Sequence, residues 1–138
     1  MTEADYELRP IGVVASPVEE LADAPRQGDE GAPDAWVELD AEVASAGQDL
    51  AIGDELVVLT WLHRARRDVL VTRPRGDATR PPTGVFSTRS PDRPNPIGLH
   101  RVRVLEVSGT RLRVAGLEAV DGTPVLDVKP VLGPIDER

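Results

Sequence analysis

Residues 99–116 read LHRVRVLEVSGTRLRVAG, and this stretch predicts a β-hairpin. Apolar and charged side chains alternate on both sides of Ser108-Gly109-Thr110, whose composition is typical of a turn. Alternation with a period of two puts one set of side chains on the core and the other set on the opposite face. The core set is predicted to be Val102, Val104, Leu112 and Val114, and the outer set is Arg101, Arg103, Arg111 and Arg113.

The four outer arginines require a negative charge nearby, because like charges on adjacent strands repel each other. Although the net charge is −8, residues 63–113 carry twelve arginines against four acidic residues. A basic segment of this kind is typical of polyanion binding, and the counter-charge is then nucleic-acid phosphate. Residues 1–62, with fifteen acidic residues against two arginines, are an equal alternative, because acidic and basic segments also neutralise each other within a fold. A second subunit is the third alternative.

Further strands are predicted on both sides of the hairpin. Residues 41–51 are compatible with one short helix, which Gly47 weakens. About eight strands with so little helix predict an all-β fold, either a barrel or a folded sheet. There is no Gly-x-Gly-x-x-Gly motif after a strand and no βαβ alternation, so the pattern excludes a Rossmann-type fold. The other predicted strands cover residues 7–15, 36–40, 56–62, 68–72 and 125–128.

Residues 84–99, GVFSTRSPDRPNPIGL, precede the hairpin and contain three prolines. Each proline fixes its own φ, removes a donor and disfavours the α region for the residue before it. Asp92, Arg93 and Asn95 are therefore predicted to lie on a stiff, extended loop that is neither helix nor central strand. Such a loop either holds polar groups in place for a ligand or is a rigid turn between two strands, and the residues alone favour neither.

The loop sequence GVFSTRSPDRPNPIG closely resembles the signature of the TsaA-like family, also called TrmO or YaeB. The resemblance implies an S-adenosylmethionine-dependent methyltransferase that methylates N6 of threonylcarbamoyladenosine in the tRNA anticodon loop. It also implies a single-sheet β-barrel that binds its cofactor near the interface of a homodimer. Three further matches follow in the order of the family: IGVVASPVEELADAPRQ (11–27), VVLTWLH (57–63) and VDGTPVLDVKP (120–130).

The resemblance implies a cofactor site assembled from four parts of the chain. Without it, Arg26 and Gln27 would be exposed residues of a proline turn, and His63 a solvated imidazole at the end of a strand. The cofactor-binding residues implied are Arg26, Gln27, His63, Arg64, Arg89, Leu99, Gly116, Leu117 and Glu118.

The chemistry implied is the in-line transfer of a sulfonium methyl group to a nitrogen, which depends mainly on positioning and desolvation. Histidine is the residue type whose ordinary pKa lies nearest to neutral pH, so His63 is the candidate for a general base. Arg89 has a planar fork that matches a carboxylate, and Asn95 can orient a base edge, so these three residues are the catalytic candidates. A carboxylate of Glu118 or Asp121 would favour the cationic sulfonium. Substrate or tRNA contacts are assigned to Arg93, Arg101, Arg103 and Asp121.

This sequence departs from the family at two positions near the implied site. Glu118 stands where the family usually has Asp, and Val131 where it usually has Tyr. The chain is further expected to be a short form, without the C-terminal extension of bacterial members. Three hypotheses follow: a tRNA N6-methyltransferase, a methyltransferase of the same scaffold acting on a small molecule, and a non-catalytic S-adenosylmethionine-binding module.

Composition limits the remaining possibilities. There is no cysteine and there are only two histidines, so neither disulfides nor a metal site is expected. The N-terminus has no signal-peptide pattern, and no apolar stretch is long enough for a membrane helix. We therefore expect one cytoplasmic domain over residues 1–138, with the motifs in residues 8–132, and no membrane partner.

Overall fold

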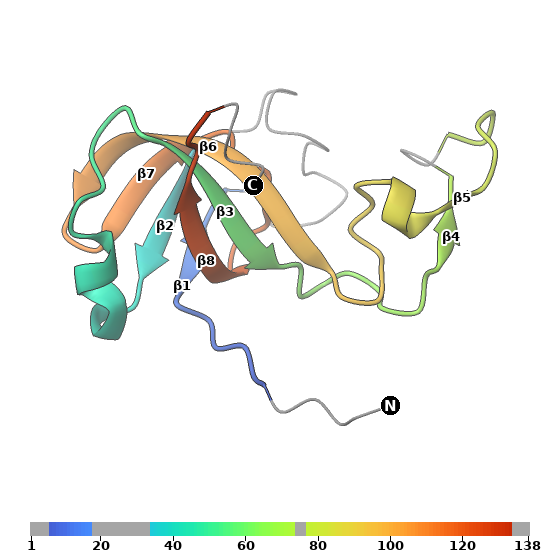
Figure 1. The fold of residues 1–138 in the computed structure, drawn as a ribbon, viewed down its shortest axis with the longest axis horizontal. Coiled ribbons are helices and arrows are strands. Elements are labelled where there is room, and N and C mark those ends of the chain that lie inside the picture. Colours follow the sequence, from blue (N-terminus) through green and yellow to red (C-terminus); the bar gives the residue numbers. More distant parts are fainter. Residues whose placement is uncertain (1–5, 18–33, 74–76, 134–138) are drawn as a thin grey trace.

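Six antiparallel strands close into a barrel, and two short strands form a separate ribbon beside it (Figure 1). The computed structural model describes residues 6–17, 34–73 and 77–133. The order around the barrel is β1-β2-β7-β6-β3-β8, and β8 closes it by pairing with both β3 and β1. The all-β, single-sheet barrel predicted from the sequence is confirmed. The barrel strands are β1 (Gly12–Ala15), β2 (Ala35–Leu39), β3 (Glu55–Trp61), β6 (Ile97–Ser108), β7 (Arg111–Ala115) and β8 (Pro124–Pro130).

The core of the barrel is aliphatic, and the predicted hairpin supplies much of it. Strands β6 and β7 pair around the turn at 109–110, and their inward residues are almost completely buried. Burying one such Val or Leu side chain contributes about 1.5–3 kcal/mol. The inward set of the hairpin is confirmed as Val102, Val104, Leu112 and Val114, at 3%, 0%, 3% and 0% exposure.

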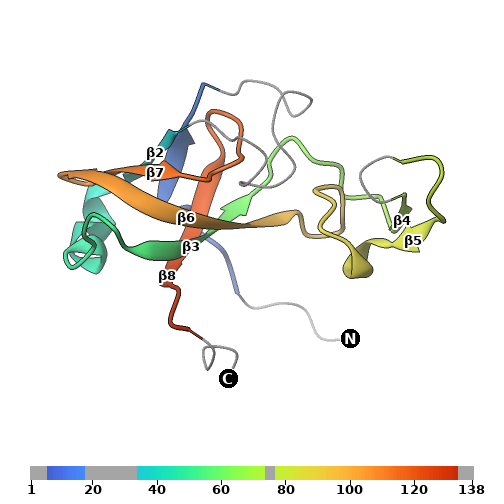
Figure 2. The same ribbon diagram turned by 90° about the horizontal axis from the view of Figure 1, so that it is seen from above.

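The long connection between β3 and β6, residues 62–96, forms a lobe that we call the arm. It contains β4 (Val71–Thr72), β5 (Thr83–Gly84) and the short 3-10 helix η5 (Val85–Ser87). Both views show the arm projecting away from the barrel (Figures 1 and 2). The strand predicted at 68–72 is thus reduced to the two residues of β4.

Two further boundaries differ from the sequence predictions. The short helix expected within 41–51 is the 3-10 helix η3 (Ala41–Gly47), which ends at the glycine. Strand β6 begins at Ile97, because Ile97 pairs with Trp61 of β3, so Leu99 lies within the strand. Within the residues described, no helix has the length and apolar character needed to cross a membrane.

The strand register brings three connections to the same end of the barrel, which we call the site end. Ala15 pairs with Trp36, and Trp61 with Ile97, so β1 and β3 end where β2 and β6 begin. β7 also ends there, because its Val114 pairs with Ala35. The connections 16–34, 62–96 and 116–123 therefore leave the barrel at this end, whereas 40–54 and the turn 109–110 lie at the other.

Candidate functional site

Arg93 holds the proline-rich loop together from within. Its Nη1 donates to the carbonyl oxygens of Thr88 (3.0 Å) and Ser90 (3.1 Å), and its Nη2 donates to that of Val85 (3.0 Å). Residues 88–96 belong to no helix or strand, as predicted, so the carbonyls of Thr88 and Ser90 have no ladder partner and the guanidinium satisfies them. The Val85 carbonyl also accepts the N–H and the hydroxyl of Thr88. The half-buried Arg93 is therefore a structural residue of the loop. Its contact with substrate or tRNA stays a prediction.

The same loop is fastened to the segment that follows β3. The backbone N–H of Arg66 donates to Asp92 Oδ1 (2.8 Å), and that of Arg93 donates to the Arg66 carbonyl (3.0 Å). The Arg67 guanidinium donates to the Pro94 carbonyl (2.7 Å) and to Asn95 Oδ1 (2.9 Å). The side-chain oxygen of Asn95 is thus engaged by Arg67. Asn95 is an exposed residue, and its side-chain nitrogen makes no hydrogen bond within the described residues.

Arg67 and Arg66 each have a second contact that the sequence did not indicate. The guanidinium of Arg67 lies 5.1 Å from the ring centroid of Trp61, close enough for a cation–π contact. Arg66 makes two hydrogen bonds, both of 3.0 Å, to the carboxylate of Asp68. This hydrogen-bonded pair lowers the pKa of Asp68 and raises that of Arg66.

His63, Arg64 and Arg89 lie on exposed positions at the site end. His63 and Arg64 form the turn directly after β3, and Arg89 lies on the proline-rich loop. Within the described ranges, His63 and Arg89 make no hydrogen bond or ion pair, so their polar groups are available to a ligand. Arg26 and Gln27 lie outside the described residues.

The segment 116–121 turns across the mouth of the barrel. Gly116 has φ +91°, and a Cβ there would lie 3.0 Å from the Arg101 carbonyl oxygen, so both its conformation and its packing require glycine. Leu117 is completely buried and packs in the core of the barrel, so it shapes this end from inside and exposes no atom at its surface. Asp121 is exposed, and its Oδ1 accepts the backbone N–H of Ser16 at 2.9 Å.

Glu118 joins a chain of polar side chains inside the barrel, which sequence reasoning missed. Its Oε1 lies 2.8 Å from His100 Nδ1, and His100 Nε2 lies 2.7 Å from Thr60 Oγ1. Thr60 and His100 are 0% and 3% exposed. The signal was present in the alternation of the hairpin, because the pattern that turns Val102 inward also turns His100 inward.

The outer arginines of the hairpin are largely neutralised by acidic residues of the N-terminal half. Arg101 pairs with Glu55 (3.2 Å), and Arg111 pairs with Glu38 (3.0 Å). Arg113 pairs with Asp34 (2.9 Å) and, within the hairpin itself, with Glu106 (3.2 Å). Of the three alternatives for the counter-charge, internal neutralisation therefore accounts for three of these arginines. Arg103 is exposed and has no ion pair within the part of the chain that the structure describes.

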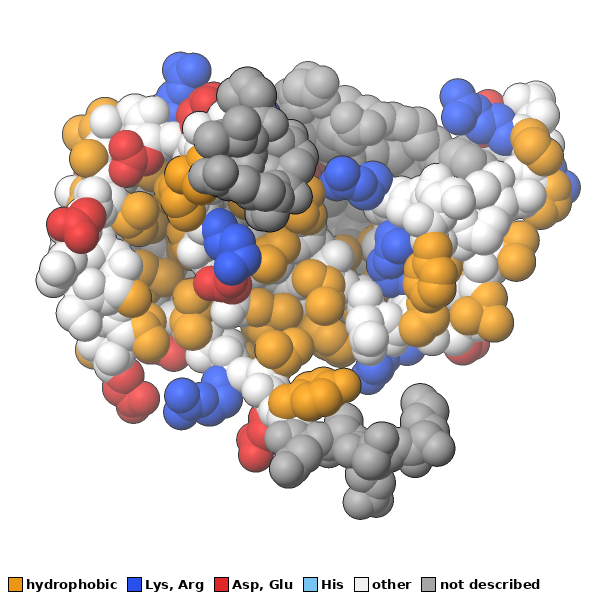
Figure 3. Space-filling model, in the orientation of Figure 1, with side chains coloured by type: hydrophobic (Ala, Val, Ile, Leu, Met, Phe, Trp, Pro, Cys, Tyr) orange, Lys and Arg blue, Asp and Glu red, His pale blue; other side chains and the backbone are white. Residues whose placement is uncertain are grey.

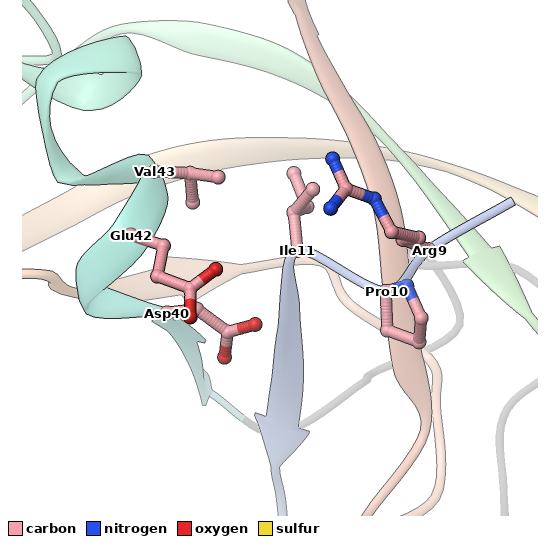
Figure 4. A pocket seen from close by; sticks show the side chains of 6 residues that line it. All are labelled: Arg9, Pro10, Ile11, Asp40, Glu42 and Val43. Atoms are coloured by element: carbon pink, nitrogen blue, oxygen red, sulfur yellow. The ribbon is translucent and has the colours of Figure 1, made fainter.

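The described residues also form a hollow at the other end of the barrel and an apolar surface. A hollow of about 220 Å³ lies beside the start of β1 and η3, lined by residues that include Arg9, Asp40 and Glu42 (Figure 4). Apolar side chains gather on the face over β3 and β8 and on the arm (Figure 3). Among the residues described, no three His, Cys, Asp or Glu side chains are grouped as a metal site would require.

The sequence model of the tRNA-methyltransferase O N-terminal domain matches residues 13–137. The chain belongs to this family. The family match spans the arm and all of the barrel except Gly12, the first residue of β1, so residues 62–96 and 116–123 at the site end lie within it.

Relatives with curated names agree with this assignment. A "Probable S-adenosyl-L-methionine-binding protein" of Methanothermobacter thermautotrophicus is 45% identical over 136 residues, covering 99% of this chain and 97% of its own. An "S-adenosyl-L-methionine-binding protein" of Archaeoglobus fulgidus is 43% identical over 129 residues, covering 94% of this chain and 91% of its own.

Solved structures of the TrmO family share the fold. The crystal structure of TrmO from Pseudomonas aeruginosa has a TM-score of 0.73 at 29% identity and covers 98% of this chain. Another TrmO crystal structure has a TM-score of 0.75 at 30% identity and covers all of this chain. This chain spans about three fifths of each TrmO chain, 62% in both cases.

Proposed function

We propose that this protein binds S-adenosylmethionine at the site end of the barrel and transfers its methyl group to a nitrogen of a second substrate. The observation that carries the proposal is the register, which brings the connections 62–96 and 116–123 to one end of the barrel. These connections hold most of the residues that the family resemblance singled out. The names of the relatives, which describe S-adenosyl-L-methionine binding, support the choice of cofactor.

In this proposal the cofactor contacts follow from charge and exposure. Arg89, exposed and without a partner in the described residues, binds the carboxylate of the methionine part through its planar fork. Glu118 accepts hydrogen bonds from the ribose or the amino group. The carboxylates of Glu118 and Asp121 favour the cationic sulfonium.

The transfer step needs a positioned nitrogen and an acceptor for its proton. The nitrogen lone pair forms the new bond to the methyl carbon as the bond from that carbon to sulfur breaks, which leaves neutral S-adenosylhomocysteine. His63 takes the N–H proton, and the exposed amide of Asn95 orients the acceptor. His63 suits this role because its imidazole has no other partner within the described residues.

The acceptor that we propose is N6 of threonylcarbamoyladenosine in the tRNA anticodon loop, in the cytoplasm. The family assignment supports it, as does the exposure of Arg103 without a partner in the described ranges, beside Arg101 on the outer face. A homodimer is part of this proposal, because Ile97 (42% exposed) and Leu99 (49% exposed) leave apolar surface on β6 for a second copy.

The test is methylation of tRNA by the purified protein. We expect S-adenosylmethionine to label tRNA from cells that lack the gene, and the labelled nucleoside to be methylated threonylcarbamoyladenosine. Binding of tRNA should weaken steeply with salt. Labelling that is absent although S-adenosylmethionine binds would overturn the tRNA assignment.

Two alternatives are each favoured by one observation. Internal ion pairs occupy three of the four outer arginines, which favours a small-molecule acceptor over tRNA. The relatives are named only for binding S-adenosylmethionine, which favours a module without catalysis. Release of S-adenosylhomocysteine with any acceptor would exclude the non-catalytic module.

A further inference from the structure

A continuous chain of three polar side chains runs through the aliphatic barrel to its site end. It begins at Thr60 of β3, continues through His100 of β6 and ends at Glu118 in the segment after β7, with contacts of 2.7 and 2.8 Å. The neighbours of His100 along β6 on the inward side are Gly98 and Val102. Buried polar groups in such surroundings are costly unless every one of them is hydrogen-bonded, and here both ring nitrogens have partners.

The hydrogen-bond partners decide where the protons lie. A carboxylate can only accept, so His100 Nδ1 carries the hydrogen and donates to Glu118. His100 Nε2 then either accepts the Thr60 hydroxyl hydrogen or, in the protonated ring, donates to the same oxygen. Thr60 is completely buried, so it meets no substrate and does not act as a nucleophile.

Gly98 leaves the space in which the side chains of Thr60 and His100 meet. Thr60 and Gly98 are opposite each other in the register of β3 and β6. A Cβ at position 98 would come closer than van der Waals contact to both Thr60 Oγ1 and His100 Nε2. The Thr60–His100 contact is therefore packed tightly on the side of Gly98, which leaves no room for a larger residue there.

Glu118 is the member of the chain that reaches solvent. Its side chain is 14% exposed, and only Oε1 is bound within the described residues. A glutamate has one more rotatable bond than an aspartate, so its carboxylate can adopt more positions unless a hydrogen bond restricts it. The imidazole of His100 holds Oε1 and leaves Oε2 without a partner among the described residues.

We propose that His100, held by Thr60, is a positioning residue that fixes the Glu118 carboxylate for hydrogen bonds to the ribose hydroxyl or amino group of the bound nucleoside cofactor. The inference rests on the proposed function and adds to it the residues that support the contact from inside the barrel. Because the Glu118 carboxylate is ordered before the cofactor binds, binding does not carry the entropic cost of ordering this side chain. Removing the anchor should weaken binding roughly three- to tenfold, the size expected for one side chain that must be ordered.

The test is a double-mutant cycle on the affinity for S-adenosylmethionine, measured by calorimetric titration. The variants are His100→Leu, Glu118→Ala and the pair combined. His100→Asn keeps a donor near the place of Nδ1 and should recover part of the affinity lost in His100→Leu. Val102→Ala, two residues along the same strand and also buried, is the matched control for loss of barrel stability without loss of the anchor.

We expect His100→Leu to weaken binding in the wild-type background and to change it by less than about 1.5-fold when Glu118 is already alanine. Equal weakening in both backgrounds, or no weakening in either, overturns the inference. Wild-type protein that does not bind S-adenosylmethionine overturns the proposed function and this inference together, whereas binding without coupling overturns the inference alone. If His100→Leu does not fold, Thr60→Val, which removes the hydrogen bond that holds the imidazole, replaces it in the cycle, and thermal unfolding of every variant identifies that case.

Discussion

The barrel and the arm of this protein are ordered by different forces. In the barrel, inward aliphatic residues such as Leu56, Val104 and Val114 are 2%, 0% and 0% exposed. In the arm, Phe86 and Leu70 are 81% and 66% exposed, and the side chain of Arg93 makes three bonds to backbone carbonyls. The barrel is held together by a packed aliphatic core, whereas the backbone of the proline-rich loop in the arm is held by hydrogen bonds.

This difference matches the demands on the two regions. Most of the barrel interior is aliphatic, and hydrophobic burial gives stability without specifying the position of polar groups; the contacts of Thr60, His100 and Glu118 are the exception. In the proposed function the arm presents Arg89 and Asn95 to ligands, and directional hydrogen bonds together with three prolines hold this part of the chain without a core. The cost is that the arm should open locally under conditions in which the barrel remains folded.

The largest expected effect is in the barrel. Leu56→Ala removes a side chain that packs among the buried residues of β3 and β6, and should lower the free energy of unfolding by about 2–5 kcal/mol. Phe86→Ala in the arm should change it by less than about 0.5 kcal/mol, because the ring is mostly in solvent. Denaturant unfolding measures both. A loss in Phe86→Ala as large as that in Leu56→Ala would contradict the division between the two regions.

An intermediate effect is expected at Arg93. Arg93→Ala leaves the Thr88 and Ser90 carbonyls without their donor and removes one donor from Val85, so the amides of residues 85–96 should exchange with solvent at least tenfold faster. The amides of β3 and β6 should be unchanged. Hydrogen–deuterium exchange measures both sets at once.

Arg89→Ala is the control for this measurement, because Arg89 has no partner in the described residues and its removal should not affect exchange in the ligand-free protein. Faster exchange throughout the barrel in Arg93→Ala would show that the arm is not an independent unit.

The smallest effect concerns pH. Hydrogen bonds from Arg66 lower the pKa of Asp68 below its ordinary value of 3.8. The folded state is therefore favoured by this pair above pH 3.8, and that contribution is lost as the pH falls through the lowered pKa. Both side chains are exposed, so we expect a clear shift in the titration of the Asp68 carboxyl carbon by NMR but little change in stability. In Arg66→Gln the midpoint should return toward 3.8. An unchanged midpoint would show that the pair does not form in solution.

The sequence predicts the barrel better than the arm for the same physical reason. The alternation in residues 99–116 is a direct record of which side chains face the core, and Val102, Val104, Leu112 and Val114 were assigned from it correctly. The proline-rich loop was also predicted, because prolines restrict the backbone wherever they stand. Its internal bonds were not, because an arginine that binds carbonyls looks the same in a sequence as one that binds a ligand.

The candidate site was predictable only in part. The alternation places His100 inside the barrel, yet the partner of a buried histidine depends on how the chain crosses the mouth of the barrel. Gly116 with its positive φ sets that path, and the sequence does not show that it brings Glu118 to His100. The partners of Arg101 and Arg111 could not be chosen from the sequence for a similar reason, because these ion pairs depend on which strands become neighbours.

The most direct test of the central claim is calorimetric titration of the wild-type protein with S-adenosylmethionine, beside Arg89→Ala and Arg9→Ala. Arg9 is also an exposed arginine, but it lies by the hollow at the opposite end of the barrel. We predict that the wild type and Arg9→Ala bind equally well and that Arg89→Ala binds at least tenfold more weakly, since a charge-assisted fork to a carboxylate contributes about 1.5–3 kcal/mol. No binding by the wild type, or equal weakening in both variants, would contradict a cofactor site at this end of the barrel.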